Sequence, residues 1–420
     1  MTLKVLDVYL NNAFTGKLIQ NDSGVLSFEY DAEYIQTKQA AISVSLPLSV
    51  DEYKGDMVKA FFSGLLPEET IREKIAKYLG VSEKNPFALL KAIGGECAGA
   101  LSLVPEGEVL TSESLDDIQV LNDQELIDLL DLIKRRPMLA GEEKIRLSLA
   151  GAQNKLAVSY KDNTVSLVGG AMPTTHILKP MIEHVDDSVH NEYFCMKLAK
   201  MVGLSVPDVY LHFAGDTPCY LIERYDRVQN EDGHTVRIHQ EDFCQVLGIL
   251  PEVKYEREGG PNLKTCFELI NRYSSKPAVD QIRMLQVTIF NYLIGNVDAH
   301  GKNFSFLYTG QKPELSPAYD LLSTAIYPDL SNKMAMKIGG RYKADELCLR
   351  HWHRLVPDTK AAESNLEKQL LTLSEKCLEH STTLKGNLEG RGLSSNVFDS
   401  ICEVIQKRAN DIKVQLDLNS

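Results

Sequence analysis

The hydrophobic pattern of this chain changes near residue 226, and this change constrains the fold more than any other feature. Before that point, short alternating or apolar runs are bounded by Gly, Pro and charged residues, as in strands. These runs are 42–48, 144–160, 175–180, 206–215 and 219–227, and one amphipathic helix, 191–204, lies between the third and the fourth. After it, apolar residues recur at helical spacing over 240–249, 262–273, 280–296, 366–380 and 395–416. A sheet-rich part followed by a helical part predicts an α+β fold of two lobes, with the active site in the cleft between them.

Helix signals near the N-terminus place a domain boundary between about 105 and 145. Residues 67–80 have a Pro near the start, apolar residues four apart and Gly80 at the stop, which predicts a helix with one buried face. In the acidic stretch 111–143, Asn122 and Glu125 stand at the capping-box positions of a second helix, which Pro137 closes. We therefore expect an N-terminal subdomain (1–110), an acidic helical connector (111–144), a sheet-rich lobe (145–226) and a helical lobe (227–420).

Composition predicts a soluble cytoplasmic protein. No run approaches the roughly 18 apolar residues that a membrane span requires. The first residues include Asp7 within their apolar stretch and lack a small-residue cleavage site, unlike a signal peptide. The eight cysteines form no C-x-x-C pair, so we expect buried thiols rather than a metal site.

The formal net charge of −13 is the reverse of what a protein that binds nucleic acid by itself requires. If DNA is involved, a partner should therefore provide most of the contact.

The segment 292–308, "YLIGNVDAHGKNFSFLY", sets polar residues between hydrophobic flanks. The preceding helix is expected to bury one side, formed by Ile282, Leu285, Ile289 and Leu293. A polar loop on such a base is a common way of presenting catalytic groups.

Phosphoryl transfer requires an acceptor for the substrate's hydroxyl proton and oxygen ligands for Mg²⁺ close by. Protein kinases supply them from an Asp and an Asn five residues apart and from a later metal-binding Asp. Asp298 and Asn303 have this spacing here, and Asp320 follows. Alone, each fits a simpler role: Asp298 as a turn residue at a helix end, Asp320 as a helix N-cap.

Several long segments in this order resemble the HipA-type serine/threonine kinases, toxins of bacterial toxin–antitoxin modules. They are "LSLAGAQNKLAV", "THILKP", "NEYFCMKLAK", "LIERYDR", "QEDFCQVLG", "KYEREGGP", "IGNVDAHGKNFSFL" and "LSPAYDLLS", which span about 145 to 325. "VYLNNAFTGKL" and "FFSGLLPE" resemble the family's N-terminal region, whereas the helices after 340 match least well. The resemblance implies a two-lobed protein-kinase-like fold with a sheet-rich N-lobe, an extra N-terminal subdomain and an all-helical C-lobe.

The resemblance also implies ATP and Mg²⁺ as cofactors and gives roles to individual residues. Asp298 would be the base that positions the hydroxyl, and Asn303 and Asp320 would hold Mg²⁺. Lys179 would reach the α- and β-phosphates with Glu192 as its ion-pair partner, although exposure on a strand or a solvated helix face explains these two residues equally well.

Neither G-x-G-x-x-G nor a Walker A motif occurs, and the small residues of 150–155 would expose backbone N–H groups to phosphate instead. In the family this segment contacts ATP, and Ser148 corresponds to an autophosphorylation site that switches the kinase off; the alternative is an ordinary strand serine. The segment 223–225 would be the hinge that binds adenine. His300 and Lys302 would contact phosphate, and a loop-stabilising hydrogen bond suits His300 as well. The expected catalytic residues are Asp298, Lys179 and His300, and the expected ATP-binding residues are Ala150, Gly151, Ala152, Gln153, Asn154, Lys155, Lys179, Glu223, Arg224, Tyr225, His300, Gly301, Lys302, Asn303, Tyr319 and Asp320.

The sequence is compatible with three functions. The favoured one is a protein kinase that phosphorylates a Ser or Thr of a bacterial translation protein, glutamyl-tRNA synthetase being the family's best-known target, and so arrests growth. A small-molecule or lipid kinase shares the Asp/Asn/Asp arrangement. A non-catalytic corepressor would act with a helix-turn-helix antitoxin, HipB in the family, on operator DNA, and this role is compatible with catalysis.

Overall fold

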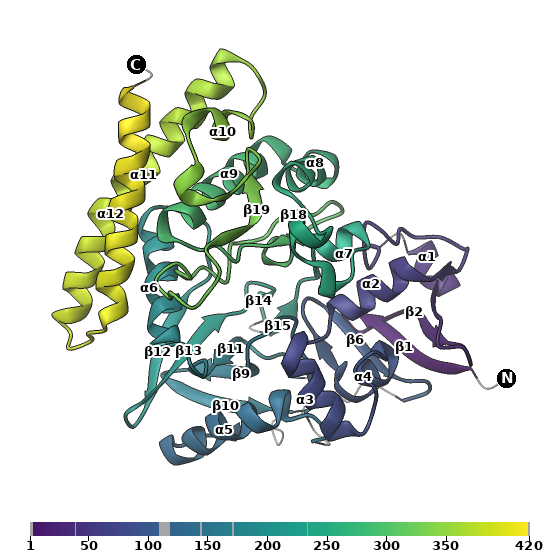
Figure 1. Cartoon of the computed structure of the whole chain (residues 1–420). Helices are drawn as coiled ribbons and strands as arrows, with labels where there is room; N and C mark the ends of the chain where they lie inside the picture. The colour runs from purple at the N-terminus through teal and green to yellow at the C-terminus, as the bar shows by residue number, and fades with distance from the viewer. Residues whose placement is uncertain are drawn as a thin grey trace. The chain divides into compact units, whose positions relative to one another are not determined.

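The computed structural model describes residues 3–37, 39–108, 118–142, 145–169, 172–232 and 234–418. The chain forms two compact units, whose elements are labelled in Figure 1. The first unit comprises Met1–Pro180, His212–Val253 and Ser305–Pro313, and the second comprises Met181–Leu211, Lys254–Phe304 and Glu314–Ser420. The predicted division at 110, 144 and 226 stays a prediction, and residues 111–117 and 143–144 of the predicted connector lie outside the described residues.

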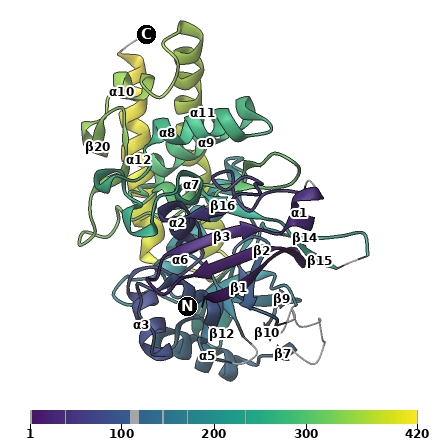
Figure 2. The ribbon, with the colours of Figure 1, turned by 90° about the vertical axis from the view of Figure 1, so that its right-hand side faces the viewer.

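The first unit begins with an antiparallel sheet of five strands in the order β4-β3-β2-β1-β6. Figure 2 shows β1, β2 and β3 side by side. Asn11 and Asn12 both have positive φ in the β1–β2 turn, as a two-residue hairpin loop requires. A Cβ at Gly16 would lie 2.1 Å from the Glu29 carbonyl oxygen, so this close strand pairing depends on glycine. The strands are β1 (Lys4–Leu10), β2 (Ala13–Gln20), β3 (Leu26–Tyr30), β4 (Tyr53–Lys54) and β6 (Leu101–Pro105).

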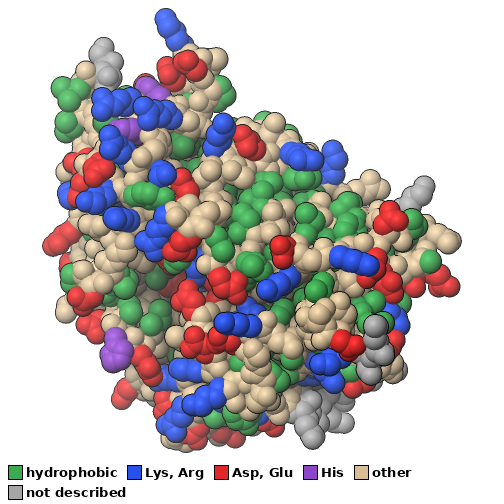
Figure 3. Space-filling view, turned by 45° about the vertical axis from the view of Figure 1, so that its right-hand side comes forward, with side chains coloured by type: hydrophobic (Ala, Val, Ile, Leu, Met, Phe, Trp, Pro, Cys, Tyr) green, Lys and Arg blue, Asp and Glu red, His purple; other side chains and the backbone are tan. Residues whose placement is uncertain are grey.

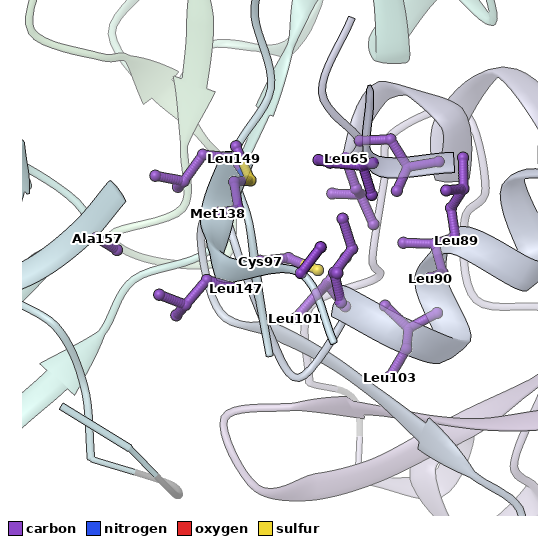
Figure 4. Packing of buried hydrophobic residues seen from close by; sticks show 14 of the residues in the cluster. Leu65, Leu89, Leu90, Cys97, Leu101, Leu103, Met138, Leu147, Leu149 and Ala157 are labelled. Atoms are coloured by element: carbon purple, nitrogen blue, oxygen red, sulfur yellow. The ribbon is translucent and has the colours of Figure 1, made fainter. Parts of the chain in front are cut away.

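Short helices complete the core of this unit, and the two predicted N-terminal helices are confirmed. The α3 helix ends at Gly80 in the left-handed conformation, and Asn122 and Glu125 form the capping box of α5. Figure 4 shows part of the core, with side chains from α4, β6 and β8 in one cluster. The elements are α1 (Ala32–Gln36), α2 (Asp56–Gly64), α3 (Glu69–Leu79), α4 (Pro86–Ile93), α5 (Asp123–Arg135) and α7 (Phe243–Leu247), with β5 (Glu96–Cys97) parallel to β8 (Leu147–Ser148).

A six-stranded sheet in the order β12-β13-β11-β9-β10-β7 carries the predicted strands of 145–226, except the first, which is β8. Its strands are β7 (Ile118–Val120), β9 (Leu156–Lys161), β10 (Thr164–Val168), β11 (His176–Lys179), β12 (Val209–Ala214) and β13 (Thr217–Glu223). Only the last three residues of β12 belong to the first unit. The remaining strands are β14 (Arg227–Gln229), paired with β15 (Thr235–Arg237), and β16 (Gln240–Asp242), paired with β17 (Ser305–Leu307).

The second unit is mainly helical, and its long helices α11 and α12 lie side by side (Figure 1). The expectation of an all-helical C-lobe was wrong, because β19 and β20 form a hairpin. Gly339 and Gly340, both with positive φ, make its turn, which a Gly-Gly pair beside an apolar run could have indicated. The elements are α6 (Ser188–Met201), α8 (Leu263–Tyr273), α9 (Pro277–Ile294), α10 (Leu349–His353), α11 (Lys360–Glu389), α12 (Asn396–Asp417), β18 (Glu314–Leu315), β19 (Lys333–Ile338) and β20 (Arg341–Lys343).

Three local predictions were wrong. Residues 42–48 form a turn closed by a bridge between Ser43 and Leu46, not a strand. Ile282 is exposed, while the other three predicted apolar residues of its helix are buried. The α6 helix is buried around most of its surface, including the polar side chain of Asn191, so it is not amphipathic.

Most of the cysteine thiols are buried, as predicted. None of the eight cysteines forms a disulfide; six are buried and two, Cys348 and Cys402, are partly exposed. None of the helices in the described ranges has an apolar stretch that would cross a bilayer. On the face shown in Figure 3, Lys and Arg side chains are interspersed with Asp and Glu.

The turn at 42–48 is held by a buried carboxylate, Glu241. The Ser43 hydroxyl donates to Glu241 Oε2 at 2.5 Å, the Val44 N–H donates to Oε1 at 3.0 Å, and the Tyr308 hydroxyl also donates to Oε1. Burial raises the pKa of Glu241 to about 7. These contacts explain why a segment with strand-like alternation does not form a strand.

Glu241 should make stability pH-dependent. Because its folded-state pKa is raised, the stabilisation is fully present below the unfolded pKa near 4.5 and is lost as pH rises through 7. We expect the unfolding free energy to fall by up to about 3 kcal/mol across this window on account of Glu241. The measurement is urea denaturation of wild type and Glu241→Gln from pH 4.5 to 8. The variant should lose this part of the slope, whereas Glu29→Gln, at an exposed site on β3, should keep it; equal slopes for all three proteins would contradict the assignment.

Candidate active site

The loop that carries Asp298 begins where α9 ends. Gly295 closes the helix with φ 83°, and a Cβ there would meet the Cβ of Ala325 at 2.8 Å, so the chain requires glycine at this point. The loop then runs through Asp298, which is exposed, to a single 3₁₀ turn at Gly301–Asn303. The predicted polar loop on a buried helix is confirmed.

Asn296, which no sequence motif indicated, links the backbone of Asp298, the predicted base, to that of Asp320, a predicted metal ligand. Its Oδ1 accepts the Asp298 N–H at 3.1 Å, and its Nδ2 donates to the Asp320 carbonyl oxygen at 3.3 Å. Nδ2 also donates to Asn291 Oδ1 at 3.0 Å, on α9. The amide therefore fixes the backbones of Asp298 and Asp320 to the same helix.

The segment after Asp320 is tied to the same loop. Thr324 Oγ1 accepts the Val297 N–H at 2.8 Å and donates to the Gly295 carbonyl at 3.1 Å. Asn191 on α6 holds Ser323 by two hydrogen bonds, of 2.9 and 2.8 Å, to its carbonyl oxygen and N–H. These contacts join the loop of Asp298 and the Asp320 segment into one hydrogen-bonded assembly within the second unit.

The side chains of Asn303 and Asp320, the two predicted metal ligands, are adjacent. Asn303 Nδ2 lies 3.4 Å from Asp320 Oδ2, and Asn303 Oδ1 accepts the His300 N–H at 3.0 Å. Asp320 has φ 53°, a strained conformation for a non-glycine residue, and no helix begins directly after it, so it is not a helix N-cap.

The pair fits Mg²⁺. This cation takes oxygen ligands, and it commonly uses one or two side chains together with phosphate oxygens and water. An amide oxygen has two lone pairs, so Asn303 Oδ1 can accept a hydrogen bond and still bind a cation. Asn303 and Asp320 are the residues that would hold the ion.

Tyr255 is a second residue that the sequence analysis missed as part of the site. Its hydroxyl donates to Asp298 Oδ1 at 2.9 Å, and its ring lies edge-on to His300, with ring centroids 5.3 Å apart. His300 and Lys302 are buried, and the Tyr319 hydroxyl donates to the Lys302 carbonyl at 2.7 Å. The predicted phosphate contacts of Gly301 and these residues remain predictions.

Lys179 lies in the first unit, on β11 opposite Tyr220 of β13. The lysine is 4% exposed, and its Nζ is 5.6 Å from the centroid of the tyrosine ring. A buried lysine beside an aromatic face is not the exposed strand residue of the simpler explanation. Glu192 is buried on α6 in the second unit, and its pairing with Lys179 stays a prediction.

The predicted phosphate loop, residues 150–155, is a turn in the first unit that is closed by its own lysine. Lys155 Nζ donates to the Ala150 carbonyl at 2.7 Å, and Gly151, with φ 112°, accepts the Glu68 N–H at 3.1 Å. The small-residue turn between two strands is therefore confirmed. Contact of Ala150, Gly151, Ala152, Gln153, Asn154 and Lys155 with ATP stays a prediction.

Ser148 is buried in β8, and its hydroxyl donates to the Leu65 carbonyl at 2.7 Å. Its neighbours Leu147 and Leu149 belong to the hydrophobic core shown in Figure 4. In this conformation the hydroxyl is inaccessible to any kinase.

The predicted hinge, residues 223–225, follows β13. The Arg224 N–H donates to the Thr175 carbonyl at 2.9 Å, and the Arg224 guanidinium is buried against Glu96 at 2.8 Å and Asp226 at 2.9 Å. The side chain of Arg224 is therefore structural, and adenine recognition by this segment stays a prediction.

Comparison with known proteins gives the family. Residues 6–104 match the model of the HipA N-terminal domain, and residues 147–381 match that of the HipA-like C-terminal domain. A putative kinase of Sinorhizobium fredii is 43% identical over 383 residues, which are 90% of this chain and 91% of the relative. The serine/threonine-protein kinase toxin HipA of Shewanella oneidensis is 33% identical over 355 residues, 81% of this chain and 80% of that protein. The fold matches a chain of the Shewanella oneidensis complex of HipA, HipB and operator DNA with a TM-score of 0.84 and 27% identity, over 98% of this chain and 97% of that chain. This chain therefore belongs to the HipA family of serine/threonine-protein kinases.

Proposed function

We propose that this chain is an ATP- and Mg²⁺-dependent serine/threonine kinase that acts as the toxin of a HipA/HipB-type toxin–antitoxin module. The observation that carries the proposal is the adjacency of Asn303 and Asp320, in one hydrogen-bonded assembly with Asp298. A bound Mg²⁺ would bridge phosphate oxygens and neutralise charge that develops during transfer.

Each residue of the assembly then has a role. Asp298 accepts the proton of the substrate hydroxyl, and Tyr255 orients its carboxylate. Asn303 and Asp320 hold the metal ion. Outside this assembly, Lys179 is proposed to contact the α- and β-phosphates.

Ser148 is proposed as an autophosphorylation site that switches the kinase off. A phosphate adds about −1.5 to −2 charges and three oxygens, for which the packed environment of this residue has no room. Phosphorylation therefore requires β8 to leave its place beside β5, and this would displace the adjoining loop 150–155.

The proposed partners are a helix-turn-helix antitoxin, operator DNA reached mainly through that antitoxin, and a protein substrate of translation such as an aminoacyl-tRNA synthetase. The similar Shewanella oneidensis chain was solved with HipB and its operator DNA. The net charge of −13 suits a basic partner and supports DNA contact through the antitoxin, with which the chain would co-repress its own operon.

The test is phosphate transfer by the purified chain from labelled ATP, with and without bacterial lysate. We expect Mg²⁺-dependent label on Ser148 and on at least one lysate protein, with EDTA abolishing both. The Ser148→Ala variant should lose the label on its own chain and keep the label on the lysate protein. Mass spectrometry would then identify that protein. No transfer by a folded chain that binds ATP would overturn the kinase proposal and leave the non-catalytic corepressor, whereas transfer only to small molecules or lipids would identify the alternative kinase class.

A further inference from the structure

A cavity of about 280 Å³ lies within the second unit, directly beside the proposed catalytic base. Asp298 and Val297 of the catalytic loop form part of its wall, together with Tyr255 and with residues 330–335 at the start of β19. The acceptor hydroxyl of any substrate must come within hydrogen-bond distance of Asp298. The cavity is therefore placed where the group that receives the phosphate has to lie.

The wall of this cavity is preformed. The Ala335 N–H donates to the Val297 carbonyl at 2.7 Å, which attaches β19 to the catalytic loop. The Tyr255 hydroxyl holds Asp298, and Thr324 holds the Val297 N–H at 2.8 Å. Three segments far apart in sequence are thus fixed around one space, so a ligand would meet an organised surface.

Of the three charged residues that line the cavity, two are cationic and the third is Asp298. Arg257 and Lys333 are the two cationic residues, and both are exposed. The Arg257 Nε atom lies 3.4 Å from Glu258 Oε1, and the Arg257 side chain is half exposed. Lys333 forms no ion pair within the described ranges. Leu330 and Met334 add apolar surface to the lining.

We propose that this cavity binds the acceptor segment of a protein substrate, and that Arg257 and Lys333 select a segment with an Asp or Glu close to the phosphorylated Ser or Thr. This inference rests on the proposed kinase function and specifies its substrate. Mixed apolar and cationic walls fit an acidic peptide, whose carboxylates pair with the rim while its backbone and side chains cover the apolar residues. A polycationic small molecule would be repelled by the same two charges.

The experiment uses the full chain with Mg²⁺ and ATP and three synthetic peptides of equal length. Each has one central Ser, and its flanking positions are Asp and Glu, Asn and Gln, or Lys and Arg. We expect kcat/KM for the acidic peptide to exceed that for the neutral one by roughly tenfold, mainly through KM, since two exposed ion pairs contribute modestly. The ratio should fall as salt rises, because the pairs are screened.

Charge reversal tests the assignment to these two residues. Arg257→Glu with Lys333→Glu should prefer the basic peptide over the acidic one. The control is Lys264→Glu, which changes an exposed lysine of α8 that lies outside the cavity and should keep the preference for the acidic peptide. Because the double variant gains activity toward one peptide, misfolding cannot imitate the expected result.

Other results would contradict either the substrate proposal or the kinase function, and the two cases can be told apart. Equal kcat/KM for the acidic and neutral peptides would overturn the proposal, as would phosphorylation of Ser148 or of lysate proteins without phosphorylation of any peptide. Phosphorylation of vesicles containing phosphatidylinositol, but not of peptides, would assign the cavity to a lipid headgroup instead. Failure to transfer phosphate to any acceptor would count against the kinase function itself.

Discussion

Replacing Asp298 by Asn is expected to lower the rate of phosphate transfer by about 10²- to 10⁴-fold, the usual contribution of a positioned general base. Asn has the same shape and keeps an oxygen that can accept the Tyr255 hydroxyl, which lies 2.9 Å from Asp298 Oδ1. What it lacks is the charge and the capacity to take the substrate's proton. Since Asp298 is exposed and its N–H rather than its carboxylate is bound to Asn296, the fold should survive the change.

The measurement is the initial rate of label transfer to Ser148 and to lysate protein, with ATP affinity determined separately by calorimetry. Glu268→Gln on α8 is the matched control, because it removes an exposed carboxylate outside the site and should leave the rate unchanged. A rate for Asp298→Asn within threefold of wild type, in a protein that binds ATP normally, would show that another group accepts the proton.

The parts of the site that the sequence predicted depend on spacing along the chain. The helix end at Gly295, the polar loop and the order Asp298, Asn303, Asp320 are all local features or features of chain order. The capping box of α5 is local in the same sense, since its two residues lie three positions apart. Such signals act within one turn or one loop, so a single sequence is enough to recognise them.

The parts that the sequence missed depend on contacts between distant segments. Asn296 is important because its amide meets Asp320, and Tyr255 because its hydroxyl meets Asp298, 43 residues away. The alternation of 42–48 was misleading for the same reason: its backbone and hydroxyl groups bind Glu241, so they do not pair in a sheet. No periodicity within a segment reports such contacts.

A second large effect is expected in the first unit, where a buried ion cluster joins β5 to the segment after β13. The Glu96 carboxylate accepts hydrogen bonds from the guanidinium groups of Arg224, at 2.8 Å, and Arg227, at 2.7 Å. The Asp226 carboxylate forms ion pairs with both arginines. Although burial alone would raise the pKa of Glu96, the charges of Arg224 and Arg227 hold it below its usual value. Burial together with the charge of Arg227 lowers the pKa of the adjacent Arg237 to about 10.

The cluster contains two buried arginines and two buried carboxylates, so loss of one carboxylate leaves a buried cation without compensation, and the partly exposed Arg237 beside it adds a further positive charge. We expect Glu96→Gln to lower the free energy of unfolding by about 3–5 kcal/mol, as measured by urea denaturation, because removing one partner leaves buried charge unpaired. The control is Glu106→Gln, which breaks the exposed pair with Lys17 and should cost less than about 1 kcal/mol. Similar losses for the two variants would mean that water reaches the cluster and screens it. A large loss for Glu96→Gln alone would show that the buried ion cluster of Glu96, Arg224, Asp226 and Arg227 is required for the stability of the first unit.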